Sequence, residues 1–216
     1  MNKHVPRKRK TIDPCPTCFL HRQRCICDSI PKHDLKTRVS LIIHAKELKR
    51  TTNTGRLALH ALTNSEMYIR GKTTERLDLS SLLVPEYETY VLFPSEDAIS
   101  LEEIQPLKPI QLIVTDGNWR QASKLNTRHP ELSHLPRVKI GAANTAQYHL
   151  RKEHFSEGLS TLEAIALAIR IIEGAEVGDS LLALYHKKLK ATLQGRGVQE
   201  HSLNESSCVG EGLQRT

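Results

Sequence analysis

The chain has 216 residues and a net charge of +7 at pH 7, which is enough length for one substantial domain with a small appendage. It contains no run of about 18 apolar residues, and its first ten residues are basic without an apolar segment. Neither a transmembrane helix nor a secretory signal is therefore predicted, and we expect a cytoplasmic protein.

The positive charge is concentrated near the N-terminus. Residues 1–40 hold ten Lys and Arg against three Asp, whereas the remaining residues hold 21 basic and 21 acidic side chains. This distribution is typical of a segment that binds a polyanion, although a basic tail can also simply aid solubility. Three Phe, five Tyr and one Trp are few for base stacking, so contacts to phosphates and to RNA shape are favoured.

The first feature along the chain is a cluster of cysteines. Residues 1–14 lack periodicity and include a basic arm, and four of the five cysteines follow within thirteen residues. In a cytoplasmic protein this spacing favours a metal over disulfides, because four thiolates satisfy tetrahedral Zn²⁺. We predict a closed, structural zinc site formed by Cys15, Cys18, Cys25 and Cys27. His21 is the alternative ligand if Cys25 or Cys27 cannot reach the metal.

Strands and helices alternate in the main part of the chain, which predicts an α/β domain with a mostly parallel sheet. Apolar runs and turn residues predict strands at 37–44, 88–93 and 110–114, an edge strand at 137–140, and helices at 51–65 and after Trp119. Neither a dinucleotide-binding glycine motif nor a P-loop is present in the sequence, which argues against those two sites.

Two further helices are predicted near the C-terminus. Ser160 and Glu163 have the spacing of a capping box, and the amphipathic pattern behind them ends before Gly174. The last helix is predicted from Asp179 to Leu193, with apolar residues facing inward. Its three lysines, Lys187, Lys188 and Lys190, are predicted to face solvent.

Asp116 follows the apolar run 110–114, at the edge of the sheet where α/β proteins collect ligands. It can act as a helix cap or as a functional carboxylate, and the residues alone leave both open. The segment 52–56 is similarly ambiguous. Its hydroxyl, amide and guanidinium groups fit a helix cap as well as a phosphate or RNA contact.

Residues 116–122, Asp-Gly-Asn-Trp-Arg-Gln-Ala, resemble the signature of the DTW-domain family, the tRNA-uridine aminocarboxypropyltransferases. Four other segments match the family in the expected order: the four-cysteine segment and residues 52–58, 92–95 and 159–165. Together they cover roughly residues 15–190. Asn118 stands where the family usually has Thr. It retains a hydrogen-bonding side chain but lacks the hydroxyl, which predicts an altered substrate position or rate.

The resemblance implies transfer of the 3-amino-3-carboxypropyl group of S-adenosylmethionine (SAM) to N3 of a uridine in tRNA, with release of 5′-methylthioadenosine. It implies a SPOUT-like domain at 37–195 with a C-terminal trefoil knot. Before it lies a segment, 1–36, with the basic arm and the zinc knuckle, and after it a polar tail, 196–216. We expect a monomer without membrane contact, and Zn²⁺ and SAM as its metal and donor.

Uracil N3 carries a proton, so the reaction needs a base within hydrogen-bond reach. Asp116 is predicted to be this base or to orient the amino group of SAM. The residues predicted to bind SAM are Leu92, Phe93, Pro94, Thr115, Gly117, Trp119, Leu159, Ser160, Thr161 and Ala164. Those predicted to bind tRNA are Arg7, Lys8, Arg9, Lys10, Arg22, Arg24, Asn53, Arg56, Arg120, Lys124, Arg151 and Lys152. Alternative functions are a SPOUT-type SAM-dependent RNA methyltransferase and a non-catalytic RNA-binding zinc protein.

Overall fold

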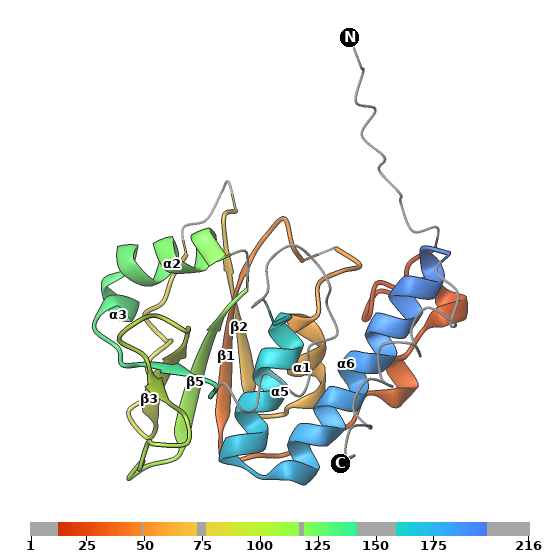
Figure 1. The fold of residues 1–216 in the computed structure, drawn as a ribbon. Helices are drawn as coiled ribbons and strands as arrows, with labels where there is room; N and C mark the ends of the chain where they lie inside the picture. Colours follow the sequence, from red (N-terminus) through yellow and green to blue (C-terminus); the bar gives the residue numbers. More distant parts are fainter. Residues whose placement is uncertain (1–12, 49, 73–76, 117–118, 142–158, 198–216) are drawn as a thin grey trace, which may run out of the picture.

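The computed structural model describes residues 13–48, 50–72, 77–116, 119–141 and 159–197. The described residues form one sheet with helices on both faces (Figure 1). The strands are β1 (Arg38–His44), β2 (Ser65–Arg70), β3 (Glu88–Leu92), β4 (Ile99–Ser100), β5 (Ile110–Thr115) and β6 (Arg137–Lys139). The α-helices are α1 (Gly55–Ala61), α2 (Trp119–Arg128), α3 (Pro130–Ser133), α5 (Thr161–Ile172) and α6 (Ala175–Gly195). Two 3-10 turns, Arg22–Arg24 and Cys27–Ser29, precede them.

The sheet has the strand order β2-β1-β5-β3-β6-β4, and every pairing is parallel. The predicted α/β class with a parallel sheet is thereby confirmed. Because all the strands run the same way, their carboxyl ends meet at one edge, and the ends of β1, β2 and β5 lie next to one another there. The predicted trefoil knot stays a prediction.

The central strands are apolar throughout because both faces of the sheet are covered. In β1 the alternate residues Val39, Leu41 and Ile43 pack in the larger core cluster, under α1, α5 and α6, whereas Ile42 packs in a second cluster with residues of α2 and α3. Gln111 of β5 is fully buried, and its Nε2 donates hydrogen bonds to Ser40 Oγ at 2.9 Å and to the Leu82 carbonyl at 2.6 Å.

Three expectations about the elements were wrong. The helix expected at 51–65 is only seven residues long. The chain continues at 65–70 as β2, an edge strand with a single buried residue and hence little apolar pattern. The strand at 137–139 is not at the edge, since the two-residue strand β4 pairs beyond it. Lys188 was expected to face solvent, but it is 1% exposed and points into the protein.

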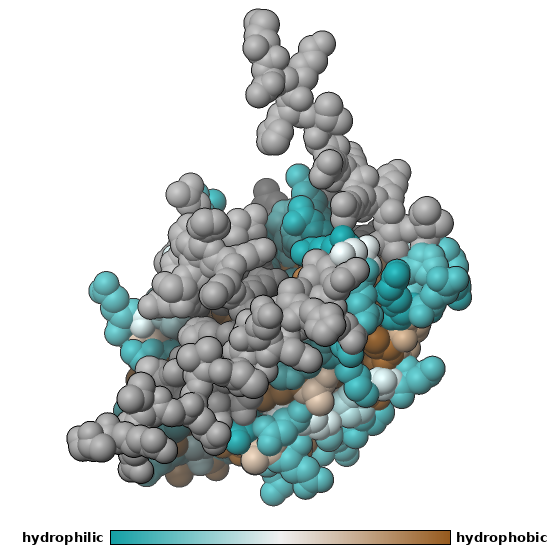
Figure 2. All heavy atoms as spheres, turned by 45° about the vertical axis from the view of Figure 1, so that its right-hand side comes forward, coloured by the Kyte–Doolittle hydropathy of each residue, from teal (hydrophilic) through white to brown (hydrophobic). Residues whose placement is uncertain are grey.

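The face of the molecule in Figure 2 is mostly hydrophilic over the described residues, with small apolar areas between the polar side chains. Within the described ranges the large apolar side chains that reach solvent are scattered: Met67, Leu83, Ile99 and Leu107. Among the helices described, none is long and apolar enough to cross a membrane.

Candidate active site

Asp116 lies immediately after β5, at the carboxyl edge of the sheet. Its backbone N–H donates to the Ile42 carbonyl at 2.9 Å, so the chain still follows the neighbouring strand β1 at this point. The side chain is 8% exposed. Its Oδ1 accepts a hydrogen bond from the Thr161 hydroxyl and its Oδ2 accepts one from the Asn53 amide, both at 2.5 Å. The carboxylate is therefore held in one orientation by two segments that are remote in sequence.

Asn53 also reaches the start of α1. Its Oδ1 accepts a hydrogen bond from the backbone N–H of Arg56 at 3.3 Å, while its Nδ2 donates a hydrogen bond to Asp116. A single amide thus satisfies a free N–H at the beginning of the helix and fixes the carboxylate. The helix cap, one of the two alternatives that the sequence left open for this segment, is therefore made by this residue, whereas a phosphate or RNA contact stays a prediction.

Thr161 is positioned by the beginning of α5. The predicted capping box is present: Ser160 Oγ accepts from the Glu163 N–H at 3.3 Å, and the Glu163 carboxylate accepts from the Ser160 N–H at 3.1 Å. The Thr161 methyl group packs closely on Gly55, where an added Cβ would lie 3.0 Å from it. The starts of α1 and α5 therefore fit together at Asp116, and a side chain at position 55 would separate them.

Arg70, the last residue of β2, was not predicted from the sequence. Its side chain is half-buried, its Nε is buried without a hydrogen-bond partner, and no ion pair to its guanidinium is found within the described part of the chain. Burial lowers the pKa of Arg70, while the negative charges of Asp116 and Glu47 act in the opposite direction. The sequence gives no strong signal for this residue, because β2 has a single buried residue and no recognisable strand pattern.

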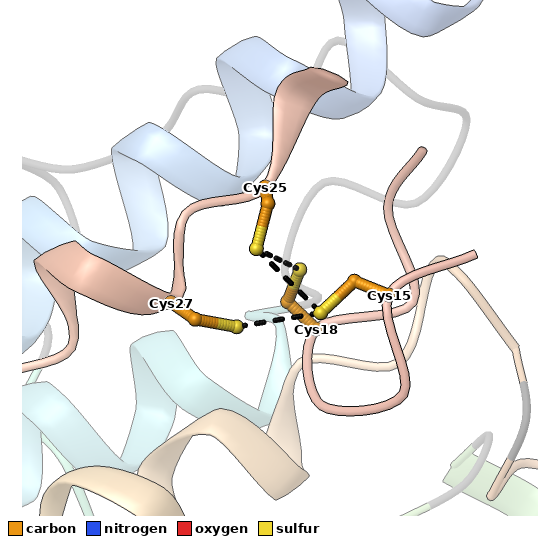
Figure 3. A group of neighbouring side chains, drawn as sticks. All are labelled: Cys15, Cys18, Cys25 and Cys27. Atoms are coloured by element: carbon orange, nitrogen blue, oxygen red, sulfur yellow. Dashed lines mark hydrogen bonds between the residues drawn. The ribbon is translucent and has the colours of Figure 1, made fainter. Parts of the chain in front are cut away.

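The four cysteines at the N-terminus form a second candidate site (Figure 3). Their sulfur atoms all lie within 4.8 Å of one another. Cys15 is 3.5 Å from both Cys25 and Cys27, and Cys18 is 3.8 Å from Cys25. A tetrahedral zinc ion with Zn–S bonds of about 2.3 Å would place its sulfurs about 3.8 Å apart. The donor set and its spacing therefore fit zinc.

All four cysteines reach this cluster, so the alternative with His21 as a ligand is not needed. The His21 Nδ1 instead accepts a hydrogen bond from the Gln23 N–H at 3.2 Å and caps a 3-10 turn. Burial raises the pKa of the Cys15 thiol, but hydrogen bonds from backbone N–H groups and the neighbouring thiols outweigh this and lower it to about 6. The pKa of the Cys27 thiol is instead raised by burial and by the neighbouring thiols, and that of Cys25 is raised as well, so the thiolate of the cluster is favoured at Cys15.

Residues 13–30, which we call the knuckle, are fastened to the helices at two points. The Lys188 Nζ of α6 donates a hydrogen bond to the Cys18 carbonyl at 2.5 Å. The Arg56 guanidinium stacks over the Phe19 ring at 4.5 Å and donates to the Leu48 carbonyl at 2.9 Å. Phe19 adopts a φ of +56°, which is uncommon for a residue other than glycine and turns its ring toward Arg56.

The sequence profile of the DTW domain matches residues 12–193. The chain belongs to the DTW-domain family. The family membership predicted from the sequence is thereby confirmed.

Several relatives of this DTW-domain protein are tRNA-modifying enzymes by name. The proteins called tRNA-uridine aminocarboxypropyltransferase 2 are 28% identical in Macaca fascicularis, over 92% of this chain and 70% of the relative, and 27% identical in Drosophila melanogaster, over 91% and 80%. The Arabidopsis thaliana tRNA-uridine aminocarboxypropyltransferase A is 24% identical, over 82% and 79%. No solved structure matches the chain.

The residues predicted to bind SAM in this DTW domain have different surroundings. Thr161 contacts Asp116, Ser160 belongs to the capping box, and Thr115 ends β5. Leu92 and Phe93 are buried in the two core clusters, whereas Pro94 is exposed. Leu159 and Ala164 are partly buried and pack against the larger cluster. Gly117 and Asn118 lie outside the described residues, and Trp119 begins α2.

The residues predicted to bind tRNA fall into four groups. Arg22 and Arg24 are exposed on the knuckle, and Arg22 pairs with Asp13 at 2.9 Å. Asn53 contacts Asp116, and Arg56 contacts Leu48 and Phe19. Lys124 is exposed on α2, and Arg120 lies in the same helix. Arg7, Lys8, Arg9, Lys10, Arg151 and Lys152 lie outside the described residues.

Proposed function

We propose that this chain transfers the 3-amino-3-carboxypropyl group of SAM to N3 of a uridine in tRNA. Its membership of the DTW-domain family and the names of its relatives support this proposal. The structural observation that carries it is Asp116, a carboxylate held by Asn53 and Thr161 at the carboxyl edge of a parallel sheet. Substrates of α/β enzymes bind at this edge.

The reaction makes two demands on the site. A bond forms between N3 and the γ-carbon of the donor, the bond from that carbon to sulfur breaks, and its electron pair stays on sulfur in 5′-methylthioadenosine. The N3 proton must leave to a base. The site must therefore hold the γ-carbon in line between N3 and sulfur, and provide an acceptor for the proton.

Asp116 can serve this reaction in two ways. As a base it would accept the N3 proton, and as an anchor it would bind the amino group of the donor. Both roles require a carboxylate of fixed orientation, which the hydrogen bonds from Asn53 and Thr161 provide. The roles differ in what Asp116→Asn changes: loss of a base lowers the rate of transfer, whereas loss of an anchor lowers the affinity for the donor.

The N-terminal part of the chain completes the proposal. The thiolates of Cys15, Cys18, Cys25 and Cys27 would hold a structural zinc ion, with no position left open for substrate. The basic excess of residues 1–40 would bind phosphates of tRNA, since phosphate contacts supply most of the affinity of such segments. The zinc would therefore shape an RNA-binding surface and take no part in the chemistry.

The experiment combines the purified protein with SAM and bulk tRNA and identifies the products by mass spectrometry. We expect 3-(3-amino-3-carboxypropyl)uridine and 5′-methylthioadenosine in equal amounts. We also expect transfer to fall by about 10²- to 10⁴-fold in Asp116→Asn if Asp116 is the base. Methylated RNA and S-adenosylhomocysteine (SAH) would indicate a methyltransferase. Absence of SAM binding by calorimetry would indicate a non-catalytic RNA-binding protein.

A further inference from the structure

Lys188 of α6 is enclosed by the protein and is 1% exposed. Its Nζ donates a hydrogen bond to the Cys18 carbonyl at 2.5 Å. Among the residues that the structure describes, no carboxylate forms an ion pair with this lysine. Enclosing an ammonium group is unfavourable unless an opposite charge lies nearby, because one carbonyl replaces only part of the lost hydration. The charge of Lys188 therefore needs an anionic partner other than a carboxylate.

The packing of α6 brings Lys188 to the cysteine cluster. One face of α6 lies against the knuckle (Figure 1). Leu184, Lys188 and Ala191 follow one another at helical spacing on this face, and Leu184 and Ala191 are buried in the same core cluster as Cys15 and Cys18. Cys18, whose carbonyl accepts the hydrogen bond, also contributes one of the four sulfur atoms of the cluster. Lys188 thus contacts the backbone of a proposed metal ligand directly.

The cysteine cluster is the anionic partner that the structure offers to Lys188. Burial lowers the pKa of Lys188 to about 8, while the charges of Cys18, Cys15 and Cys27 act in the opposite direction. Four thiolates around one Zn²⁺ leave two net negative charges on the group. Cys15 and Cys18 are only 8% and 2% exposed, so water reaches one side of such an anion poorly. A cation on that side stabilises it.

A second cation, Arg22, lies on the knuckle itself. The hydrogen bond and charge of Asp13 raise the pKa of Arg22, and the charges of Cys15 and Cys25 act in the same direction. The Arg22 side chain is 64% exposed and paired with Asp13 at 2.9 Å, so water and this carboxylate offset its effect on the sulfurs. Lys188 is enclosed and has no such carboxylate within the described residues. Of these two cations, Lys188 is the more effective counter-charge.

Given the zinc site of the proposed function, we propose that Lys188 is the counter-ion of the metal-loaded cysteine cluster and couples zinc binding to the docking of the knuckle on α6. Groups outside the ligand set orient the ligands and tune the metal, and losing one typically costs 10- to 100-fold in metal affinity. Such coupling is reciprocal: if the docked α6 strengthens zinc binding, zinc strengthens docking by the same factor.

The alternative is a mechanical role, in which Lys188 only fastens the knuckle through the Cys18 carbonyl. The two roles differ in what the charge does. A counter-ion changes the affinity of the thiolates for the metal and the electron density on sulfur. A fastener changes how firmly the knuckle is held, and leaves the electrons of the cluster unaffected.

The test measures zinc affinity by competition with a chelator for the wild type, Lys188→Met, Lys188→Arg and the control Lys187→Met, which removes an exposed lysine of the same helix. We expect Lys188→Met to weaken zinc binding about 10- to 100-fold. Lys187→Met should stay within about twofold of the wild type, because an exposed charge acts weakly. Lys188→Arg should fall between the wild type and Lys188→Met, since it keeps the charge in a different shape.

Two further measurements separate the charge from the fastening. With cobalt(II) in place of zinc, the sulfur-to-metal charge-transfer band should move to longer wavelength in Lys188→Met, because loss of a nearby cation raises the energy of the sulfur electrons. A band at the wild-type position would overturn the counter-ion role. In hydrogen exchange, zinc should slow the knuckle amides more in the wild type than in Lys188→Met. An equal effect of zinc in both proteins would overturn the coupling.

The same experiments separate this inference from the zinc site on which it rests. A wild-type protein that binds no zinc refutes the site, and with it the role of Lys188. A wild-type protein that binds zinc no more tightly than Lys188→Met refutes the role of Lys188 alone. Unchanged exchange in β1 and β5 shows that the variant is folded. If Lys188→Met does not fold, Lys188→Gln removes the charge and keeps a polar side chain, and the same outcomes apply to it.

Discussion

The Thr161 side chain makes two contacts, and each of them can be removed by a different substitution. Its hydroxyl donates to Asp116 at 2.5 Å, and its methyl group packs on Gly55. Thr161→Val keeps the methyl group and removes the donor. Thr161→Ser keeps the donor and removes the methyl group. The pair therefore distinguishes a positioning role toward Asp116 from simple packing of α5 on α1.

The magnitude follows from the type of hydrogen bond. A hydrogen bond to a charged group contributes about 1.5–3 kcal/mol, so Thr161→Val should lower kcat/KM for transfer by roughly 10- to 100-fold. Thr161→Ser should stay within about threefold of the wild type in kcat/KM and lose about 1 kcal/mol of unfolding free energy. Kinetics with SAM and tRNA and urea unfolding would measure both. Wild-type kcat/KM in Thr161→Val, with a loss in Thr161→Ser, would refute the positioning role.

Three further predictions concern Asn53, the metal and the N-terminus. Asn53→Asp keeps the acceptor for the Arg56 N–H of α1 but places a second carboxylate against Asp116. Because like charges raise the pKa of the pair, the acid limb of the pH–rate profile should move to higher pH. An unmoved limb would contradict this. Metal analysis should find about one zinc per chain. The Cys18→Ser variant should lose this zinc and become sensitive to proteolysis in the knuckle, while it still binds SAH. A wild-type protein that contains no zinc and nevertheless resists proteolysis in the knuckle would exclude the zinc site. Deleting residues 1–10, which hold five basic residues, should weaken all tRNAs alike and flatten the plot of log affinity against log salt. Unchanged affinity and slope would move tRNA binding to the main domain.

The sequence predicted the parts of the fold that carry a strong local pattern. The structure is strongly determined by the apolar runs of β1, β3 and β5 and by the capping box of α5. The predicted bounds of these elements lie close to the observed ones. β2 and β4 were missed because an edge strand with one buried residue and a strand of two residues lack a period that can be recognised. Pairing across the sheet creates these strands, and that information is not local.

The candidate site shows the same division. Asp116 and the four cysteines stood out because their neighbours in sequence mark them. Lys188 did not, because its role depends on a partner far along the chain. The lysine pattern on α6 predicted a solvated face, yet Lys188 is enclosed with the Cys18 carbonyl as its hydrogen-bond acceptor. A charge on a helix face is usually solvated, and only the position of the knuckle reverses that rule here.

The hydrogen bond from Lys188 to the Cys18 carbonyl spans 170 residues of sequence. During synthesis on the ribosome the cysteines emerge first, whereas α6 emerges after every strand of the sheet. The contact of the knuckle with Arg56 can form as soon as α1 is in place, but its contact with Lys188 exists only once α6 has folded against α5. A chain shortened before α6 would therefore hold the knuckle by only one of these two contacts, and the buried face of Cys15 and Cys18 would be exposed to the chaperones and proteases that monitor nascent chains.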